Sequence, residues 1–184
     1  FKDLNYLFES CMNPSTGLPN SAIRNLKDGR YQVYNELIFD HHSNEDSTIV
    51  YSQISGKHVV AKGIYDILTG FFHFRKNILA WNILGSEDVI IKTYFTDQLW
   101  DLRIRYAGED LINTKYGELL CYKFKPVTVI GRYFENDDDM IVWFTQDPEH
   151  IPVRIKLNLR FGSLTGELDD YRNPDFQLLK TRSE

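Results

Sequence analysis

The acidic run Glu135-Asn136-Asp137-Asp138-Asp139 is the segment whose residue types come nearest to a metal site. Carboxylate and amide oxygens are the ligands that Ca²⁺ prefers in proteins. The run lacks the glycine and the distal glutamate that an EF-hand loop places at fixed positions. We therefore interpret it as a solvated hairpin turn, and we predict no metal site here.

The histidines and cysteines do not form a recognisable ligand set either. His41 and His42 are adjacent and would point to opposite faces of a strand, and they lack the i, i+4 spacing of a helical zinc pair. The remaining histidines are isolated in the sequence: His58, His73 and His150. Cys11 and Cys121 are the only cysteines, and they form either one disulfide or two separate small apolar residues. No cofactor is predicted.

Motifs of nucleophilic catalysis are absent from the sequence. Neither Gly-x-Ser-x-Gly nor a phosphate-binding glycine loop occurs, so no catalytic residue is predicted. One enzymatic alternative stays open, a hydrolase or carbohydrate-active enzyme that uses scattered carboxylates such as Asp101 and Asp147. That alternative requires two carboxylates facing each other across a cleft. We rank it below two non-enzymatic hypotheses.

Large aromatic side chains are the better candidates for a functional site. Ligand pockets are mostly apolar, although core packing is the first explanation for such residues. The candidate ligand-binding residues are Phe71, Phe74, Trp81, Trp100 and Trp143. The leading hypothesis is a module that binds a lipid, another apolar or amphipathic ligand, or an envelope protein. The alternative is a structural or interaction domain whose core is filled by its own helix.

The elements that would position these residues are mostly short strands. From Ile151 to Arg160 apolar and polar residues alternate, which predicts that Val153, Ile155 and Leu157 face the core while Arg154 and Lys156 face solvent or a polar lumen. Asp28-Gly29 predicts a hairpin turn, and Gly108-Glu109-Asp110 predicts another turn. Further strands are predicted over residues 4–10, 22–26, 31–40, 48–53, 89–96, 99–106, 119–126 and 140–145. Short connections between them indicate antiparallel pairing.

One helix is predicted after Gly63. Ile64, Ile67, Leu68, Phe71 and Phe74 recur at helical spacing and would plug the concave side of the sheet. Gly70 disfavours a helix interior by roughly 1 kcal/mol relative to alanine. The predicted fold class is mainly β, with an antiparallel curved sheet, a partly open barrel or a sandwich, and at least one packed helix.

Composition sets the limits of these hypotheses. The 184 residues are 42% hydrophobic and 14% aromatic, which fits one folded domain over residues 1–171 and a polar tail over residues 172–184. The net charge of -5 gives no basic surplus for nucleic-acid binding. No run of eighteen apolar residues occurs, so no transmembrane helix is expected.

Several segments together resemble a known family. The chain is similar to the bacterial exported-protein family known as domain of unknown function 3108, found in putative exported proteins of Bacteroides-like bacteria. The likeness runs from about Tyr6 to Tyr171 and is carried by Tyr34-Asn35 through Phe39-Asp40, Lys115-Tyr116-Gly117, Cys121 to Pro126, Trp143 with Asp147, Ile151 to Ile155, and Gly162-Ser163-Leu164.

The resemblance implies a location but no activity. It implies export to the periplasm or cell envelope, and it implies that members carry a signal sequence and further strands upstream of the position of Phe1. The resemblance leads us to expect that the N-terminal part of the family pattern is missing from the present chain. No activity is implied, and so no catalytic residues are carried over.

Overall fold

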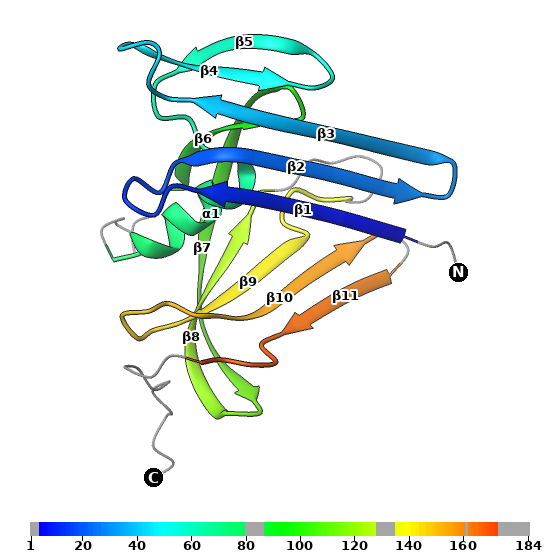
Figure 1. Cartoon of the computed structure of the whole chain (residues 1–184). Coiled ribbons are helices and arrows are strands. Elements are labelled where there is room, and N and C mark those ends of the chain that lie inside the picture. The colour runs from blue at the N-terminus through cyan, green and yellow to red at the C-terminus, as the bar shows by residue number, and fades with distance from the viewer. Residues whose placement is uncertain (1–3, 80–86, 128–134, 161, 173–184) are drawn as a thin grey trace. The chain divides into compact units, whose positions relative to one another are not determined.

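Antiparallel strands dominate the structure, a computed structural model that describes residues 4–79, 87–127, 135–160 and 162–172. They form two sheets accompanied, within these residues, by one α-helix (Figure 1), which confirms the predicted mainly β fold. The first sheet has the order β1-β2-β3-β4-β5. Its strands are β1 (Leu4–Met12), β2 (Pro19–Asp28), β3 (Tyr31–Asp40), β4 (Ser47–Ser52) and β5 (Gly56–Ala61).

The second sheet has the order β11-β10-β9-β8-β7-β6. Its strands are β6 (Val89–Phe95), β7 (Gln98–Thr114), β8 (Gly117–Pro126), β9 (Met140–Thr145), β10 (Pro152–Leu159) and β11 (Gly162–Glu167). Each sheet begins and ends on different strands, so neither closes into a barrel within the described chain.

Contacts group the chain into two compact units. The first unit comprises Phe1–Arg75 and Ile91–Leu102, and therefore holds the five-stranded sheet, nearly all of the helix and the tip of the β6–β7 hairpin. The second comprises Lys76–Ile90 and Arg103–Glu184. The single domain over residues 1–171 stays a prediction, because compact units of this kind occur within one domain as well as between two. Residues 173–184 of the predicted tail lie outside the described residues.

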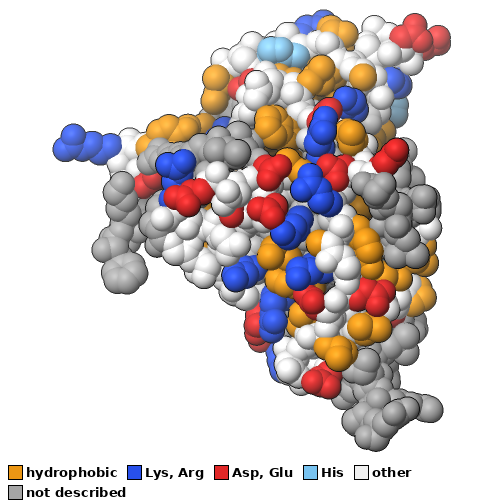
Figure 2. Space-filling model, turned by 180° about the vertical axis from the view of Figure 1, so that it is seen from behind, with side chains coloured by type: hydrophobic (Ala, Val, Ile, Leu, Met, Phe, Trp, Pro, Cys, Tyr) orange, Lys and Arg blue, Asp and Glu red, His pale blue; other side chains and the backbone are white. Residues whose placement is uncertain are grey.

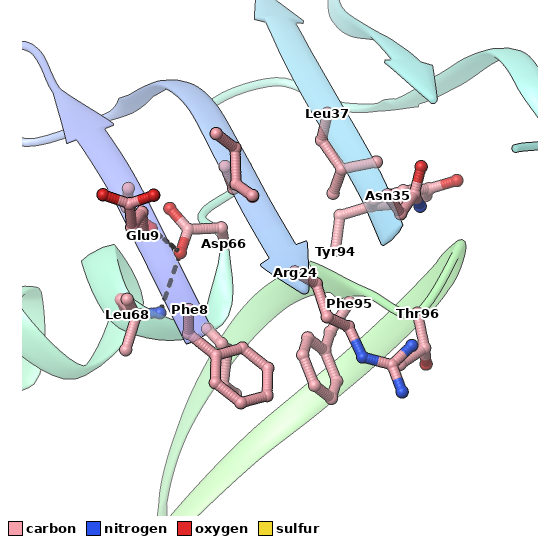
Figure 3. A pocket seen from close by; sticks show the side chains of 14 residues that line it. Phe8, Glu9, Arg24, Asn35, Leu37, Asp66, Leu68, Tyr94, Phe95 and Thr96 are labelled. Atoms are coloured by element: carbon pink, nitrogen blue, oxygen red, sulfur yellow. Dashed lines mark hydrogen bonds between the residues drawn. The ribbon is translucent and has the colours of Figure 1, made fainter. Parts of the chain in front are cut away.

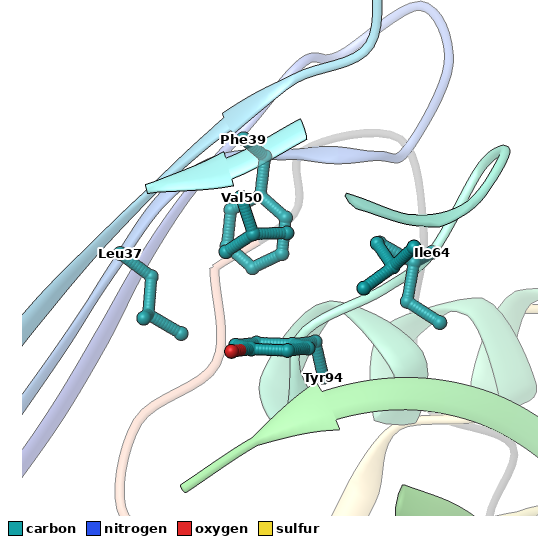
Figure 4. Packing of buried hydrophobic residues seen from close by; sticks show 6 residues of the cluster. Leu37, Phe39, Val50, Ile64 and Tyr94 are labelled. Atoms are coloured by element: carbon teal, nitrogen blue, oxygen red, sulfur yellow. The ribbon is translucent and has the colours of Figure 1, made fainter. Parts of the chain in front are cut away.

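The sheet of the first unit is a meander with one strongly buried face. Its β2–β3 turn is the predicted Asp-Gly hairpin, in which Gly29 takes a φ of 58°. Alternate residues of the central strands point to the core, as period-two geometry requires. Figure 4 shows the buried cluster, which consists of Leu37, Phe39, Val50, Val60, Ile64 and Tyr94.

Helix α1 (Ile67–Lys76) begins three residues later than predicted. Asp66 is its N-cap: the Asp66 Oδ1 accepts a hydrogen bond from the Leu68 amide at 2.8 Å, which ends the preceding extended segment. Ile64 is buried but lies outside the helix. Phe74 is fully buried whereas Phe71 is only half-buried, so Phe74 is the residue that anchors the helix.

The second unit is built around a separate core that contains Ile112, Leu119, Cys121, Trp143, Ile151 and Val153. The predicted alternation of burial along β10 holds only at Val153, which is 1% exposed. Ile155 and Leu157 are as partly exposed as Arg154 and Lys156, so this part of the prediction is wrong. Alternation in the sequence predicts which side chains share one face of a strand, but that face is buried only where another layer of the protein packs against it. Of the β10 residues, only Val153 belongs to the core cluster of this unit.

Two further expectations are settled by the strands. The turn predicted at Gly108–Asp110 is wrong, because β7 continues to Thr114; its pairing with β8 shifts register between Tyr106 and Glu109, and Gly108 takes a φ of 97°. Cys11 and Cys121 are both free thiols, the first exposed and the second buried.

Candidate functional site

A pocket in the first unit lies among β1, β2, the start of α1 and the tip of the β6–β7 hairpin (Figure 3). Its lining is mainly apolar: Phe8, Ala22, Leu37, Ile67, Leu68 and Phe95. The volume open to the centre of a water molecule is about 30 Å³, and the space free of protein atoms is about 380 Å³ when the solvent-filled mouth is included. The interior thus holds one or two waters.

Two phenyl rings and one guanidinium shape the mouth of this pocket. The ring centroids of Phe8 and Phe95 lie 6.3 Å apart, and Phe8 stands on the edge strand β1 with 38% of its surface exposed. Arg24 of β2 places its guanidinium carbon 5.7 Å from the Phe95 centroid, a cation–π contact. Phe8 and Arg24 are cross-strand partners, so the three side chains form one patch.

Arg24 has no charged partner among the described residues. Its Nε is buried and makes no hydrogen bond. On the face shown in Figure 2, lysine and arginine side chains are interspersed with aspartate and glutamate. Other cations form ion pairs within each unit, among them Lys92–Asp101, Lys125–Asp138 and Arg154–Glu167. Arg24 is a cation whose local environment is aromatic.

The carboxylate of Asp66 also lines the pocket, but its hydrogen-bonding capacity is already used. It accepts hydrogen bonds from the hydroxyls of Ser10 and Thr69, at 2.7 Å and 2.6 Å, and from the Leu68 amide. These bonds tie β1 to the helix N-terminus. Asp66 therefore positions the wall of the pocket, and no ion pair joins it to Arg24.

The β6–β7 turn positions Phe95 through an unusual backbone. Thr96 and Asp97 both have positive φ values, 51° and 60°, a conformation that usually favours glycine or asparagine. The amide of Asn35 donates to both carboxylate oxygens of Asp97 and holds this turn against β3. Burial raises the pKa of Asp97, but hydrogen bonds from Ser52, Ser55 and Asn35 outweigh burial and keep this pKa below its usual value.

The predicted aromatic residues that the structure describes do not line this pocket. Phe71 and Phe74 lie on α1, Trp100 is half-buried in β7, and Trp81 falls outside the described residues. Trp143 belongs to the core of the second unit and donates its indole N–H to Asp110 Oδ2 at 2.8 Å. The pocket residues that sequence reasoning missed are Phe8, Arg24 and Phe95. One signal was readable, since Arg24 stands on the parity of Ala22 and Leu26, which points into the core.

The carboxylates considered for catalysis have structural partners. Asp101 forms an ion pair with Lys92 at 2.7 Å, and Asp147 accepts the Glu149 amide within the β9–β10 turn. The two belong to different units. In the acidic run, Asp139 is 7% exposed and accepts the amides of Glu135 and Asn136 at 2.8 Å and 2.7 Å.

Within the described chain no group of three or more metal-ligating side chains is arranged to hold an ion, and no helix there is long and apolar enough to cross a membrane.

Comparisons with known proteins found a similar solved structure and a family. No curated protein matches the sequence significantly. Among solved structures, the crystal structure of a beta-barrel-like protein of domain of unknown function DUF1849 from Brucella abortus is similar, with 8% sequence identity, coverage of 81% of this chain and 71% of that chain, and a TM-score of 0.44.

The family comparison agrees with the resemblance noted in the sequence. The model of the family described as protein of unknown function (DUF3108) matches residues 1–169, which is most of the chain. That span includes both sheets, the helix and every residue that lines the pocket of the first unit. The chain therefore belongs to the DUF3108 family of proteins of unknown function.

Proposed function

We propose that this chain is a non-enzymatic protein of the periplasm or cell envelope that binds a small amphipathic ligand in the pocket of its first unit. One observation carries the proposal: an apolar pocket mouth is lined by two aromatic rings and by one arginine that has no charged partner in the part of the chain that the structure describes. Ligand sites commonly combine apolar walls with a few polar groups that fix orientation.

The size of the pocket limits how a ligand binds. The interior of about 30 Å³ accepts only the end of an alkyl chain, so the rest of the molecule lies in the open mouth against Phe8 and Phe95. Phe8 stands on an edge strand and is partly exposed, so its ring has room to move as the mouth fills. The proposed location in the periplasm or cell envelope rests on the resemblance of the sequence to a family of exported proteins.

A pair of neighbouring substitutions tests ligand binding. Phe8→Ala removes an aromatic wall, whereas Leu7→Ala changes the adjacent residue, which points to the opposite sheet face and is similarly exposed at 42%. Binding of single-chain amphiphiles is measured by calorimetry and by native mass spectrometry. We expect Phe8→Ala to weaken binding about tenfold and Leu7→Ala to leave it unchanged. Equal effects of the two changes, or no binding by the unmodified protein, would reject the proposal.

A second candidate function, a protein-interaction module, is favoured by the other face of the five-stranded sheet. Tyr34, Ile38, Tyr51 and Val59 are exposed there, with Ile38 directly paired to Tyr51 across β3 and β4. Exposed apolar patches mark interaction surfaces. If a second copy covers this face, sedimentation should show concentration-dependent dimers that disappear in Ile38→Ser. A monomer at every concentration would exclude that form of the candidate.

A further inference from the structure

We propose that the ligand is an unbranched, single-chain amphiphile with an anionic head group of the carboxylate class, and that Arg24 binds this head group. The inference rests on the proposed function, because it names the chemical class of the molecule in the same pocket. It starts from a charge without a counter-charge in an aromatic environment.

Arg24 is oriented into the pocket by its strand register. It pairs with Phe8 on β1 and with Asn35 on β3, so its side chain stands on the inward face of the sheet, the face on which Leu37 is buried. Figure 3 shows its guanidinium beside Phe95 and Thr96. A buried donor without a partner is costly, and a carboxylate would supply a charge-assisted, often bidentate, hydrogen bond.

The nearby acidic residues are already engaged elsewhere. The Asp66 carboxylate accepts hydrogen bonds from Ser10, Leu68 and Thr69. Asp97 is held by Asn35. Glu9 contributes to the pocket lining, but it is exposed and its register partner is Ile23, so its side chain belongs to the opposite sheet face. None of the three forms an ion pair with Arg24, which leaves the guanidinium available to an external anion.

The shape of the pocket selects the apolar part of the ligand. An interior that holds only one or two waters is too narrow for a branched or cyclic group, and an unbranched chain end has the smallest cross-section. Because the guanidinium lies over Phe95 and Phe8 is its cross-strand partner, the carbons next to the head group would contact both rings. Head group and chain are therefore recognised by one contiguous surface.

Paired ligands and matched variants test the inference. Binding of decanoate and of 1-decanol is measured at pH 8 for the unmodified chain, Arg24→Gln, Arg24→Lys and the exposed-turn control Arg30→Gln. We expect Arg24→Gln to weaken decanoate binding about 10- to 100-fold with little effect on decanol, and Arg24→Lys to retain part of the affinity. Arg30→Gln should bind both like the unmodified chain.

The outcomes separate this inference from the proposed function. If neither amphiphile binds the unmodified protein, the proposed function fails. If both bind with equal affinity, or if Arg24→Gln weakens them equally, the pocket binds amphiphiles but the anionic assignment is overturned. A measurement that needs no variant covers the case in which Arg24→Gln does not fold: the preference of the unmodified protein for decanoate should disappear as the ligand carboxyl is protonated below about pH 5.

Discussion

The side chain of Asn35 in β3 forms hydrogen bonds with Asp97 in the β6–β7 turn and with Ser52 at the end of β4. Its Nδ2 donates to both oxygens of the Asp97 carboxylate, at 3.1 Å and 3.2 Å, while its Oδ1 accepts the Ser52 hydroxyl at 3.1 Å. Asn35 is 5% exposed, so these bonds form largely out of water. The backbone of Asp97 has a positive φ, and the bonds from Asn35 stabilise a turn that its own residues disfavour.

We predict that Asn35→Asp is strongly destabilising although the two side chains have nearly the same shape. The change removes a donor and places a second carboxylate against Asp97, which should lower the free energy of unfolding by about 2–4 kcal/mol at pH 7. Part of the loss should be regained near pH 5, because two adjacent carboxyls share a proton. Urea unfolding measures both effects. The control is Asn25→Asp, because Asn25 lies on β2 and points to the opposite face of the sheet from Asn35. A pH-independent loss of stability in Asn35→Asp would contradict the explanation.

A second prediction concerns Gly70 in helix α1. Alanine normally stabilises a helix interior by about 1 kcal/mol relative to glycine. Here a Cβ would lie 3.0 Å from the Thr93 Cγ2 and 3.5 Å from Leu102 Cδ2, and Thr93 is fully buried. We therefore expect Gly70→Ala to destabilise the protein by about 1–3 kcal/mol, as overpacking does.

The companion change is Thr93→Ser, which removes the obstructing methyl group and keeps the hydroxyl that donates to the Trp100 carbonyl. In this background Gly70→Ala should be neutral or stabilising, so the two changes should be non-additive in a double-mutant cycle. Additive effects would show that the glycine is needed for another reason.

Much of the fold could be predicted from local patterns. The Asp28-Gly29 turn and the run from Met140 to Thr145 each carry enough information in a few neighbouring residues. The errors occur where one pattern has two structural outcomes. Gly108 marks a bulge within β7, and a glycine between polar residues looks the same in a turn. At the helix start, apolar periodicity suggested Ile64, but Asp66 followed by Thr69 is a capping pattern that was readable.

The pocket could not be predicted because its parts are far apart in the sequence. Phe8 and Phe95 come into contact only when the tip of the β6–β7 hairpin packs on the first sheet. Aromatic bulk drew attention to Phe74 and Trp143, and both turn out to be core residues. Size and hydrophobicity do not separate a core residue from a pocket residue, whereas an arginine on an apolar strand face does point to a special site.

A third prediction ranks the phenylalanines of helix α1. Phe74 is fully buried, Phe71 is half-buried and Phe72 is 47% exposed. Phe74→Ala should lower the free energy of unfolding by about 3–5 kcal/mol, the usual range for losing a buried ring. Phe71→Ala should cost less, and Phe72→Ala should change stability by no more than about 0.5 kcal/mol. Chemical denaturation gives the order, and a loss at Phe71 equal to that at Phe74 would place both rings in the core.

The last prediction concerns His41, which is 8% exposed. It directly follows β3 and forms hydrogen bonds with the start of β2 and with β4. Its Nε2–H donates to the Pro19 carbonyl at 2.9 Å, so Nδ1 is the acceptor for the Thr48 hydroxyl at 3.0 Å. Burial lowers the pKa of His41 below its ordinary value of 6.5, and the charges of His42 and Lys62 act in the same direction. The hydrogen bond to Pro19 and the charge of Asp40 oppose this shift.

Because the folded protein holds His41 neutral, the unfolded chain binds more protons over the pH range just below 6.5. Stability contributed by His41 is therefore fully present above pH 6.5 and is lost as the pH falls from there toward the lower folded-state pKa. We expect His41→Gln to flatten the decline in unfolding free energy between about pH 7.5 and 5. His42→Gln should retain most of the decline, because burial, and not the charge of His42, is the largest cause of the lowered His41 pKa. Urea unfolding at several pH values measures the slope, and an equally steep decline without His41 would assign the pH dependence to other groups.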